Sequence, residues 1–156
     1  MAGEGVFPKS NGDIVYASDF NRVNHLLNSA TWATSFSTTS TSYVDVTSAT
    51  VTLSGLDSNE TYTFMAFADF ISSHSADGQS VLAAMVIGSA TVTESNDQNS
   101  GGTDIRSSRS LHGYLSGQTG ITSITTKLQI KVVIGTGTIN KDSLTNQRIT
   151  VWAIPA

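Results

Sequence analysis

Hydrophobic and polar residues alternate with a period of two over most of the chain after residue 31, and this pattern predicts β-strands. The clearest run is 61–71, where one face carries only Tyr62, Phe64, Ala66, Ala68 and Phe70. Residues 49–54 and 128–134 alternate in the same way, with polar side chains on the opposite face. We therefore expect a mainly β protein, in which residues 32–156 form an antiparallel two-sheet sandwich of jelly-roll type with eight or nine strands.

Polar, turn-forming segments separate these runs. Residues 55–60, 72–78, 94–103 and 135–142 combine glycine with asparagine, aspartate or serine, which favours loops. The segment 94–103 has two glycines and no apolar residue, so we expect it to be the most exposed loop of the β-domain.

A segment near the N-terminus departs from the period of two. Ser18 suits a helix N-cap, Asp19 suits the first turn, and the apolar residues that follow have helical spacing: Phe20, Val23, Leu26 and Leu27. The pattern predicts a helix over 19–28, preceded by a glycine-rich arm and followed by a short connector, so that residues 1–31 form an N-terminal unit. Because so short a helix is marginal alone in water, its apolar stripe must dock either on this chain's own body or on another protein.

The same segment carries a resemblance to a known group of proteins. Gly12, Asp13, Ala17, Asp19, Phe20 and Asn21 fit a pattern of the form G-D-x-(V/L)-x-A-x-D-(F/L)-N, which resembles the N-terminal segment of many tailed-bacteriophage virion proteins. The resemblance covers only the beginning of the chain. It implies a structural protein of the virion surface, anchored to other capsid or tail proteins by Phe20, Val23, Leu26 and Leu27. Its β-domain would serve as capsid decoration or as a tail-fibre, receptor-binding domain.

Two predicted strands have more apolar surface than one core requires. Met65, Phe67 and Ile71 lie opposite the core face of 61–71, and residues 81–87 are apolar on both faces. Because exposed apolar patches usually mark interfaces, we expect a homo-oligomer with Met65, Phe67 and Ile71 at the interface. A trimer is implied by resemblance alone: a helix followed by a jelly roll is similar in architecture to trimeric phage fibre tips, capsid decoration proteins and the heads of the tumour-necrosis-factor class.

Composition narrows the range of partners. Only 13% of residues are charged, the net charge is −4, and no lysine or arginine cluster occurs, which argues against nucleic acid. No apolar run has membrane length and no signal-peptide pattern is present, so we expect no membrane partner and assembly in the host cytoplasm. A serine- and threonine-rich, charge-poor chain is typical of adhesins and virion surfaces, and a host-surface glycan would suit it as a partner.

Candidate chemistry is sparse. Without cysteine, disulfides and thiolate metal sites are excluded. His25 falls on the predicted helix, His74 in a predicted solvated loop and His112 within a strand, while Arg106 and Arg109 fit an ordinary solvated strand. Three oxygen-bearing residues weakly resemble a calcium loop that lacks its closing glutamate: Asp97, Asn99 and Asp104.

These observations predict a non-enzymatic protein with no catalytic residue, cofactor or metal. Two other functions remain open. A stand-alone carbohydrate-binding sandwich would be a monomer whose tryptophan or tyrosine fluorescence responds to sugar. A β-fold hydrolase would show turnover, although the sequence contains no nucleophile elbow, phosphate-binding loop or zinc-binding HExxH motif.

Overall fold

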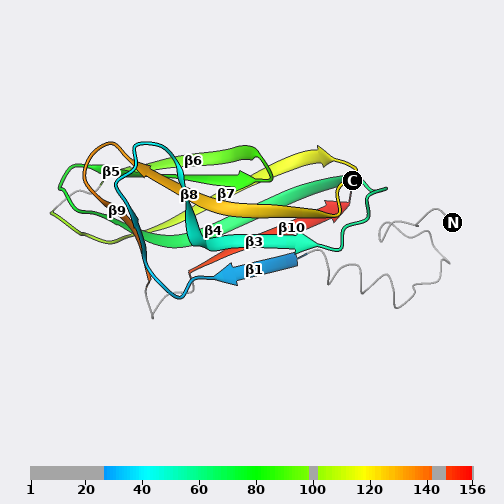
Figure 1. Ribbon diagram of the computed structural model, residues 1–156, viewed down its shortest axis with the longest axis horizontal. Helices are drawn as coiled ribbons and strands as arrows, with labels where there is room; N and C mark the ends of the chain where they lie inside the picture. Colours follow the sequence, from blue (N-terminus) through cyan, green and yellow to red (C-terminus); the bar gives the residue numbers. More distant parts are fainter. Residues whose placement is uncertain (1–26, 99–101, 142–146, 156) are drawn as a thin grey trace.

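The computed structural model describes residues 27–98, 102–141 and 147–155, which form two antiparallel β-sheets facing each other (Figure 1). Sheet A contains β1 (Leu27–Thr31), β2 (Phe36–Thr38), β4 (Tyr62–His74), β7 (Ser107–Gln118), β9 (Gly137–Asn140) and β10 (Arg148–Pro155). Sheet B contains β3 (Val44–Ser54), β5 (Ser80–Ile87), β6 (Ala90–Gln98) and β8 (Ser123–Val132). The prediction of a mainly β, two-sheet sandwich is confirmed.

Sheet A is built around β4, the longest strand that the structure describes. On one side β4 pairs with β10 over Tyr62–Asp69 and with β9 over Ile71–His74; on its other side it pairs with β7. β1 extends the sheet beyond β10, while the strand order in sheet B is β3-β8-β5-β6. Between β3 and β10 the chain therefore crosses repeatedly from one sheet to the other, so that neighbouring strands in space are mostly distant in sequence.

The core lies between the sheets and follows the predicted alternation. The inner face of β4, including Phe64 and Phe70, is buried against apolar side chains from β5 and β8 such as Met85, Leu128 and Ile130. Each fully buried side chain of this size contributes about 1.5–3 kcal/mol. On β3, Ala49, Val51 and Leu53 are buried whereas Thr50, Thr52 and Ser54 are exposed, as the sequence predicted.

The second apolar face of β5 needs no partner molecule. Ala84 and Val86 lie on the outer side of sheet B but are buried, because β5 is central and its neighbours carry longer side chains. Gln129 of β8 and Glu94 of β6 lie opposite Ala84, and Lys127 lies opposite Val86. The aliphatic stems of such side chains cover small apolar neighbours while their polar ends remain in water.

The described residues contain no helix. The prediction of a helix over 19–28 is therefore wrong for its last two residues, which are the part of it that the structure describes. Leu27 and Asn28 belong to β1, while Phe20, Val23 and Leu26 lie outside the described residues. The predicted connector after Asn28 is also part of β1, so these residues belong to the sandwich. Backbone pairing with β10 supplies the stability that the side-chain pattern does not reveal, and the Asn28 side chain donates to the Thr52 carbonyl of sheet B at 2.7 Å.

Three predicted loops are shorter than expected because strands continue through polar residues. β4 extends to His74, β6 extends to Gln98, and β9 occupies part of the segment 135–142. Polar side chains are tolerated in these strands where a neighbour supplies a partner: buried Asn140 donates from Nδ2 to the Ser73 hydroxyl at 2.9 Å.

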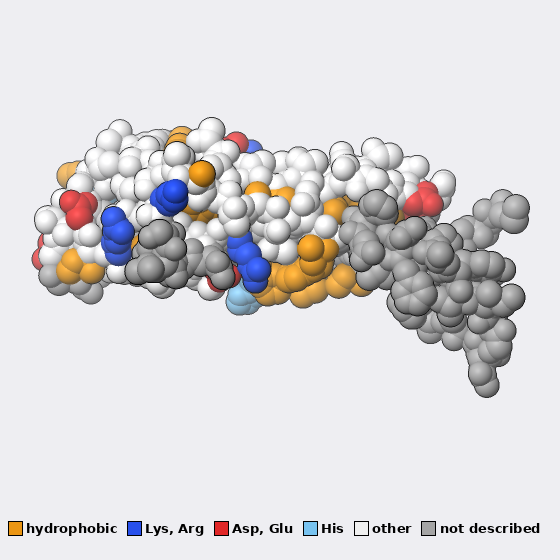
Figure 2. Space-filling model, turned by 90° about the horizontal axis from the view of Figure 1, so that it is seen from below, with side chains coloured by type: hydrophobic (Ala, Val, Ile, Leu, Met, Phe, Trp, Pro, Cys, Tyr) orange, Lys and Arg blue, Asp and Glu red, His pale blue; other side chains and the backbone are white. Residues whose placement is uncertain are grey.

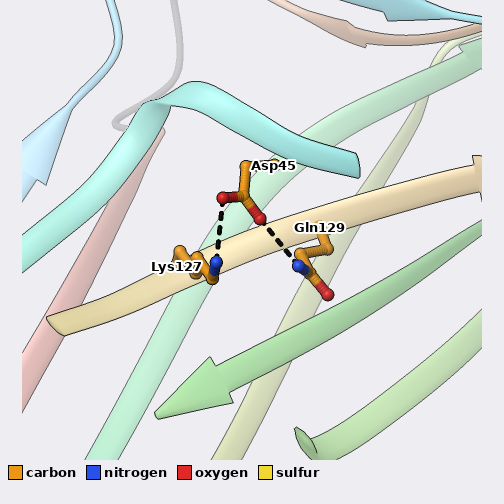
Figure 3. A network of polar contacts seen from close by, with 3 residues as sticks. All are labelled: Asp45, Lys127 and Gln129. Carbon is orange, nitrogen blue, oxygen red and sulfur yellow. Dashed lines mark hydrogen bonds and ion pairs between the residues drawn. The ribbon is translucent and has the colours of Figure 1, made fainter. Parts of the chain in front are cut away.

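A polar network spans an irregularity in the pairing of β3 with β8. The register shifts between Asp45 and Thr50, and Asp45 there accepts from Lys127 Nζ at 2.8 Å and from Gln129 Nε2 at 2.6 Å (Figure 3). These two hydrogen bonds, first that from Lys127, hold the pKa of the Asp45 carboxyl below its ordinary value. The carboxylate is half-exposed, so the ion pair contributes only modestly to stability.

We predict that Asp45→Asn lowers the free energy of unfolding by about 0.2–1 kcal/mol at neutral pH. Because the folded-state pKa is depressed, this contribution is present above about pH 4 and is lost as the pH falls through the folded pKa. Urea unfolding of the wild type and the variant from neutral to acidic pH measures the difference. A difference that persists unchanged near about pH 2 would contradict the assignment to this carboxylate.

Candidate functional site

The outer face of sheet A carries a row of apolar and aromatic side chains across four adjacent strands. Leu27 of β1 is opposite Trp152 of β10, Trp152 is opposite Met65 of β4, and Met65 is opposite Tyr114 of β7. We call these four residues the apolar row. Tyr114 is 70% exposed, Leu27 46% and Met65 37%. In the view from the β1 side, hydrophobic side chains gather along one margin of the molecule, beside a histidine and a basic side chain (Figure 2).

A second set of aromatic contacts adjoins this row. Phe67, two residues along β4 from Met65, meets the Trp152 ring edge to face with the ring centroids 4.9 Å apart. The His112 ring is stacked beside the Phe67 ring, with the two ring centroids 6.2 Å apart. Of the eight large hydrophobic side chains that are exposed among the described residues, five lie on this face: Leu27, Met65, Phe67, Tyr114 and Ile154. The face is therefore much more apolar than a solvated sheet surface needs to be.

The face becomes polar two residues further along β4. Asp69 lies between Arg148 of β10 and Ser110 of β7, and the Ser110 hydroxyl donates to the Asp69 carboxylate. Two hollows meet at Asp69. One, of about 230 Å³, has Phe67 and Trp152 in its wall, and the other, of about 350 Å³, is lined by Ser108, Ser110 and Gln147.

The predicted interface residues are placed in two different environments. Met65 and Phe67 lie exposed on the outer face, where the alternation of β4 predicts them. Ile71 has the same outward register as Met65 and Phe67 but is only 6% exposed, so it is not available to a partner in the same way. Of the predicted anchoring residues only Leu27 is described, and it belongs to the apolar row.

His74 is a buried structural residue, so its prediction as part of a solvated loop is wrong. Its side chain is fully buried at the end of β4. The Nε2–H donates to the Ile134 carbonyl at 2.6 Å, and Nδ1 accepts from the Ala76 amide at 3.0 Å. The His74 carbonyl also accepts from the Asp104 amide at 2.8 Å, so this residue ties together three loops at one end of the sandwich.

Arg109 also differs from its prediction, because it faces inward between the sheets. One guanidinium nitrogen donates to the Val81 carbonyl at 3.0 Å, the group contacts the Ser95 hydroxyl, and it lies 5.2 Å from the centre of the Phe70 ring. Its position two residues before buried Leu111 is the signal in the sequence that places it on the inner face of β7. The guanidinium thus joins sheet A to sheet B.

Neither a metal cluster nor a membrane-crossing helix is found in the part of the chain that the structure describes. No group of three or more His, Asp or Glu side chains there could hold a metal ion. Of the weak calcium pattern, Asn99 lies outside the described residues, as does His25. Within the same residues no helix has the length and apolar character that crossing a membrane requires.

Comparisons with known proteins identify a structure with a similar fold but no protein with a similar sequence. No protein-family model matches the chain, and no characterised protein matches it in sequence. The phage resemblance therefore has no support at the level of a sequence family. A structure of dimeric latent PorU from Porphyromonas gingivalis is similar over 81% of this chain with a TM-score of 0.56 and 8% identity, which shows a shared fold alone. This chain covers only 12% of PorU.

Two further structures are similar at a lower level. The VP2 subviral particle of infectious bursal disease virus has a TM-score of 0.39 and 15% identity, over 81% of this chain and 35% of that one. The C-terminal carbohydrate-binding module (CBM6) of LamC from Zobellia galactanivorans has a TM-score of 0.35 and 13% identity, over 66% of this chain and 71% of that one. With TM-scores below 0.5, neither similarity indicates a function for this protein.

We predict that His74→Ala lowers the free energy of unfolding by about 2–4 kcal/mol, because it leaves a cavity and removes the partners of the Ile134 carbonyl and the Ala76 amide. Urea unfolding measures the change. His112→Ala is the matched control: it removes the same kind of ring from the exposed face and should cost much less. Equal losses in both variants would contradict the structural role assigned to His74.

Proposed function

We propose that this chain is a non-enzymatic structural protein of a tailed-phage virion whose β-domain is exposed on the particle surface. The N-terminal pattern from Gly12 to Asn21 supports the phage origin. In this proposal Phe20, Val23 and Leu26 anchor the chain to other virion proteins, and the sandwich serves as capsid decoration or as a receptor-binding domain. The function requires no cofactor or metal, and the particle assembles in the host cytoplasm.

The observation that carries the structural role is the apolar outer face of sheet A. The hydrophobic effect disfavours leaving Leu27, Met65, Phe67 and Tyr114 in water together, and a second copy of the same chain would cover them. Closed symmetry is the usual result when identical chains associate. We propose a homotrimer in which the apolar row forms the contact between subunits.

The order of the strands supports the choice of a trimer. Sheet A has the order β1-β10-β4-β7 and sheet B the order β3-β8-β5-β6, which is a jelly-roll arrangement with crossings between the sheets. The jelly-roll body resembles, in architecture, trimeric fibre tips, decoration proteins and tumour-necrosis-factor heads. The support is an analogy of folds, and a fold alone does not determine a function.

A carbohydrate-binding module is the second candidate function. The observation in its favour is the pair of hollows at Asp69, where aromatic rings and hydrogen-bonding groups lie together. A stand-alone module of this kind would be a monomer, whereas the virion protein would be an oligomer. Solution mass therefore separates the two proposals.

We predict that the isolated protein is a stable trimer at micromolar concentration. Multi-angle light scattering should then give about three times the single-chain mass of 16.4 kDa. Met65→Ser with Tyr114→Ser should convert it to a folded monomer, because both changes remove apolar surface that contributes nothing to the core of the subunit. The matched control is Val133→Ser with Ile134→Ser, which removes exposed aliphatic side chains that do not belong to the outer face of sheet A.

A wild-type monomer would refute the oligomeric role. A wild-type dimer would retain the interface but remove the support from trimeric analogues. If Val133→Ser with Ile134→Ser dissociated the oligomer and Met65→Ser with Tyr114→Ser did not, the interface would lie elsewhere on the molecule.

A further inference from the structure

The two hollows on the outer face of sheet A adjoin Asp69, which lines both, and together they form one candidate site. The smaller hollow has the Phe67 and Trp152 rings in its wall, and the larger hollow is lined by polar residues of β7 and by Gln147, which precedes β10. The volumes, about 230 and about 350 Å³, approach or fall within the range of small-ligand sites. This site shares Leu27 and Trp152 with the apolar row and extends away from the row through Asp69, so a bound sugar would lie at the edge of the subunit contact and touch the shared Trp152.

Gln147 gives independent evidence for a ligand. It is only 5% exposed, it lines the larger hollow, and neither its amide nitrogen nor its amide oxygen has a hydrogen-bond partner. Buried polar groups in folded proteins are almost always paired, so an unpaired amide at the wall of a hollow needs an explanation. Both atoms are buried in the structure, so a ligand that both donates and accepts hydrogen bonds would satisfy them once the Gln147 side chain turns toward the hollow.

The charges around the site restrict the kind of ligand. Asp69 lies at its centre, which disfavours a phosphate, sulfate or carboxylate group. Arg148 lies opposite Asp69 in the adjacent strand and lines the smaller hollow, which disfavours a cationic ligand. A neutral molecule rich in hydroxyl groups meets neither repulsion, and its hydroxyls can donate to the carboxylate and accept from a guanidinium.

The aromatic wall points to the same chemistry. Phe67 and Trp152 form an edge-to-face pair beside Asp69, and such rings present apolar surface to the C–H faces of a sugar ring. Strand addition by a peptide does not fit this place, because both edges of β4 are already paired with β10 and β7.

We propose that the site centred on Asp69 binds a neutral oligosaccharide, with one sugar ring against Phe67 and Trp152 and the next against Gln147 and Ser110. Asp69 accepts hydroxyl hydrogen bonds from both rings, and the Gln147 amide donates to one hydroxyl and accepts from another. The proposal rests on the proposed function for the source of the glycan, which would be the host surface, but the binding itself depends only on this site.

The test begins with the full-length protein on an array of neutral and acidic glycans. Isothermal titration then uses four neutral trisaccharides: maltotriose, cellotriose, laminaritriose and mannotriose. Trp152 adjoins the site whereas Trp32 is buried in the core, so binding should change the tryptophan fluorescence, and Trp152→Phe should remove that change. We expect neutral glycans to bind in preference to acidic ones.

Two variants locate the site. Asp69→Asn should weaken binding by about tenfold or more, while Asp45→Asn, the same change on the outer face of sheet B, should leave it unchanged. Gln147→Leu should also weaken binding by about tenfold or more and yet keep or raise the melting temperature, because it replaces an unpaired buried amide with an apolar group. A purely structural Gln147 would instead lose stability on this substitution and leave glycan affinity unaltered.

The outcomes separate this proposal from the trimer. Absence of binding to every neutral glycan, a preference for acidic glycans, or binding that survives both Asp69→Asn and Gln147→Leu would overturn the saccharide site. Light scattering on the same samples reports the trimer independently. A trimer that binds no glycan would refute the saccharide site and keep the proposed virion role. A monomer that binds glycan would refute the oligomeric role and keep the saccharide site. Dissociation of the trimer by Asp69→Asn would assign the hollows to the subunit interface and overturn the saccharide proposal.

Discussion

The alternation of side chains along β4 is the constraint on which the rest of the structure depends. Each residue of this strand belongs either to the core or to the outer face of sheet A, and a shift by one residue would exchange the two sets. Phe64 and Phe70 fill the core because they are even-numbered in this register; Met65, Phe67 and Asp69 are displayed for the same reason. Pairing on both edges, to β10 and β9 on one side and β7 on the other, fixes that register.

Because core and outer face are coupled in this way, the functional surface is supported by the most firmly paired part of the molecule. The apolar row contains one residue from each of four adjacent strands, so its geometry is set by backbone hydrogen bonds and does not depend on loops. Arg109 adds a connection from the same sheet to β5 through the Val81 carbonyl. A site on paired strands is held more precisely than one on loops, which suits either subunit contact or recognition of a rigid sugar ring.

The sequence predicts the parts of the fold that depend on side-chain alternation. The strands at Thr61–Ile71 and Val81–Ile87, and the inward and outward sets on β3, follow directly from apolar periodicity. The exposure of Met65 and Phe67 follows from the same rule. The prediction fails where backbone pairing decides: β1 has no alternation of its own and forms because β10 offers it an edge.

The burial of polar residues in the interior is also hard to predict from the sequence. His74 reads as part of a polar loop because serine and aspartate surround it, and one of the partners that make its burial favourable, the Ile134 carbonyl, is distant in sequence. The hollows at Asp69 were not predicted either, since Asp69, Ser110 and the adjacent Gln147 and Arg148 come from three segments widely separated in sequence. Long-range partners of this kind leave no periodic signal in a single chain.

The placement of the first and last strands of the sandwich has a consequence for its use as a building block. Leu27 is opposite Trp152, so the start of β1 and the end of β10 lie at the same end of the sandwich, while the loops joined by His74 lie at the other (Figure 1). Polypeptide entering at β1 and polypeptide leaving after β10 are therefore neighbours. A fusion partner attached at either point would project from one pole, and the opposite pole would remain accessible for display of an inserted peptide.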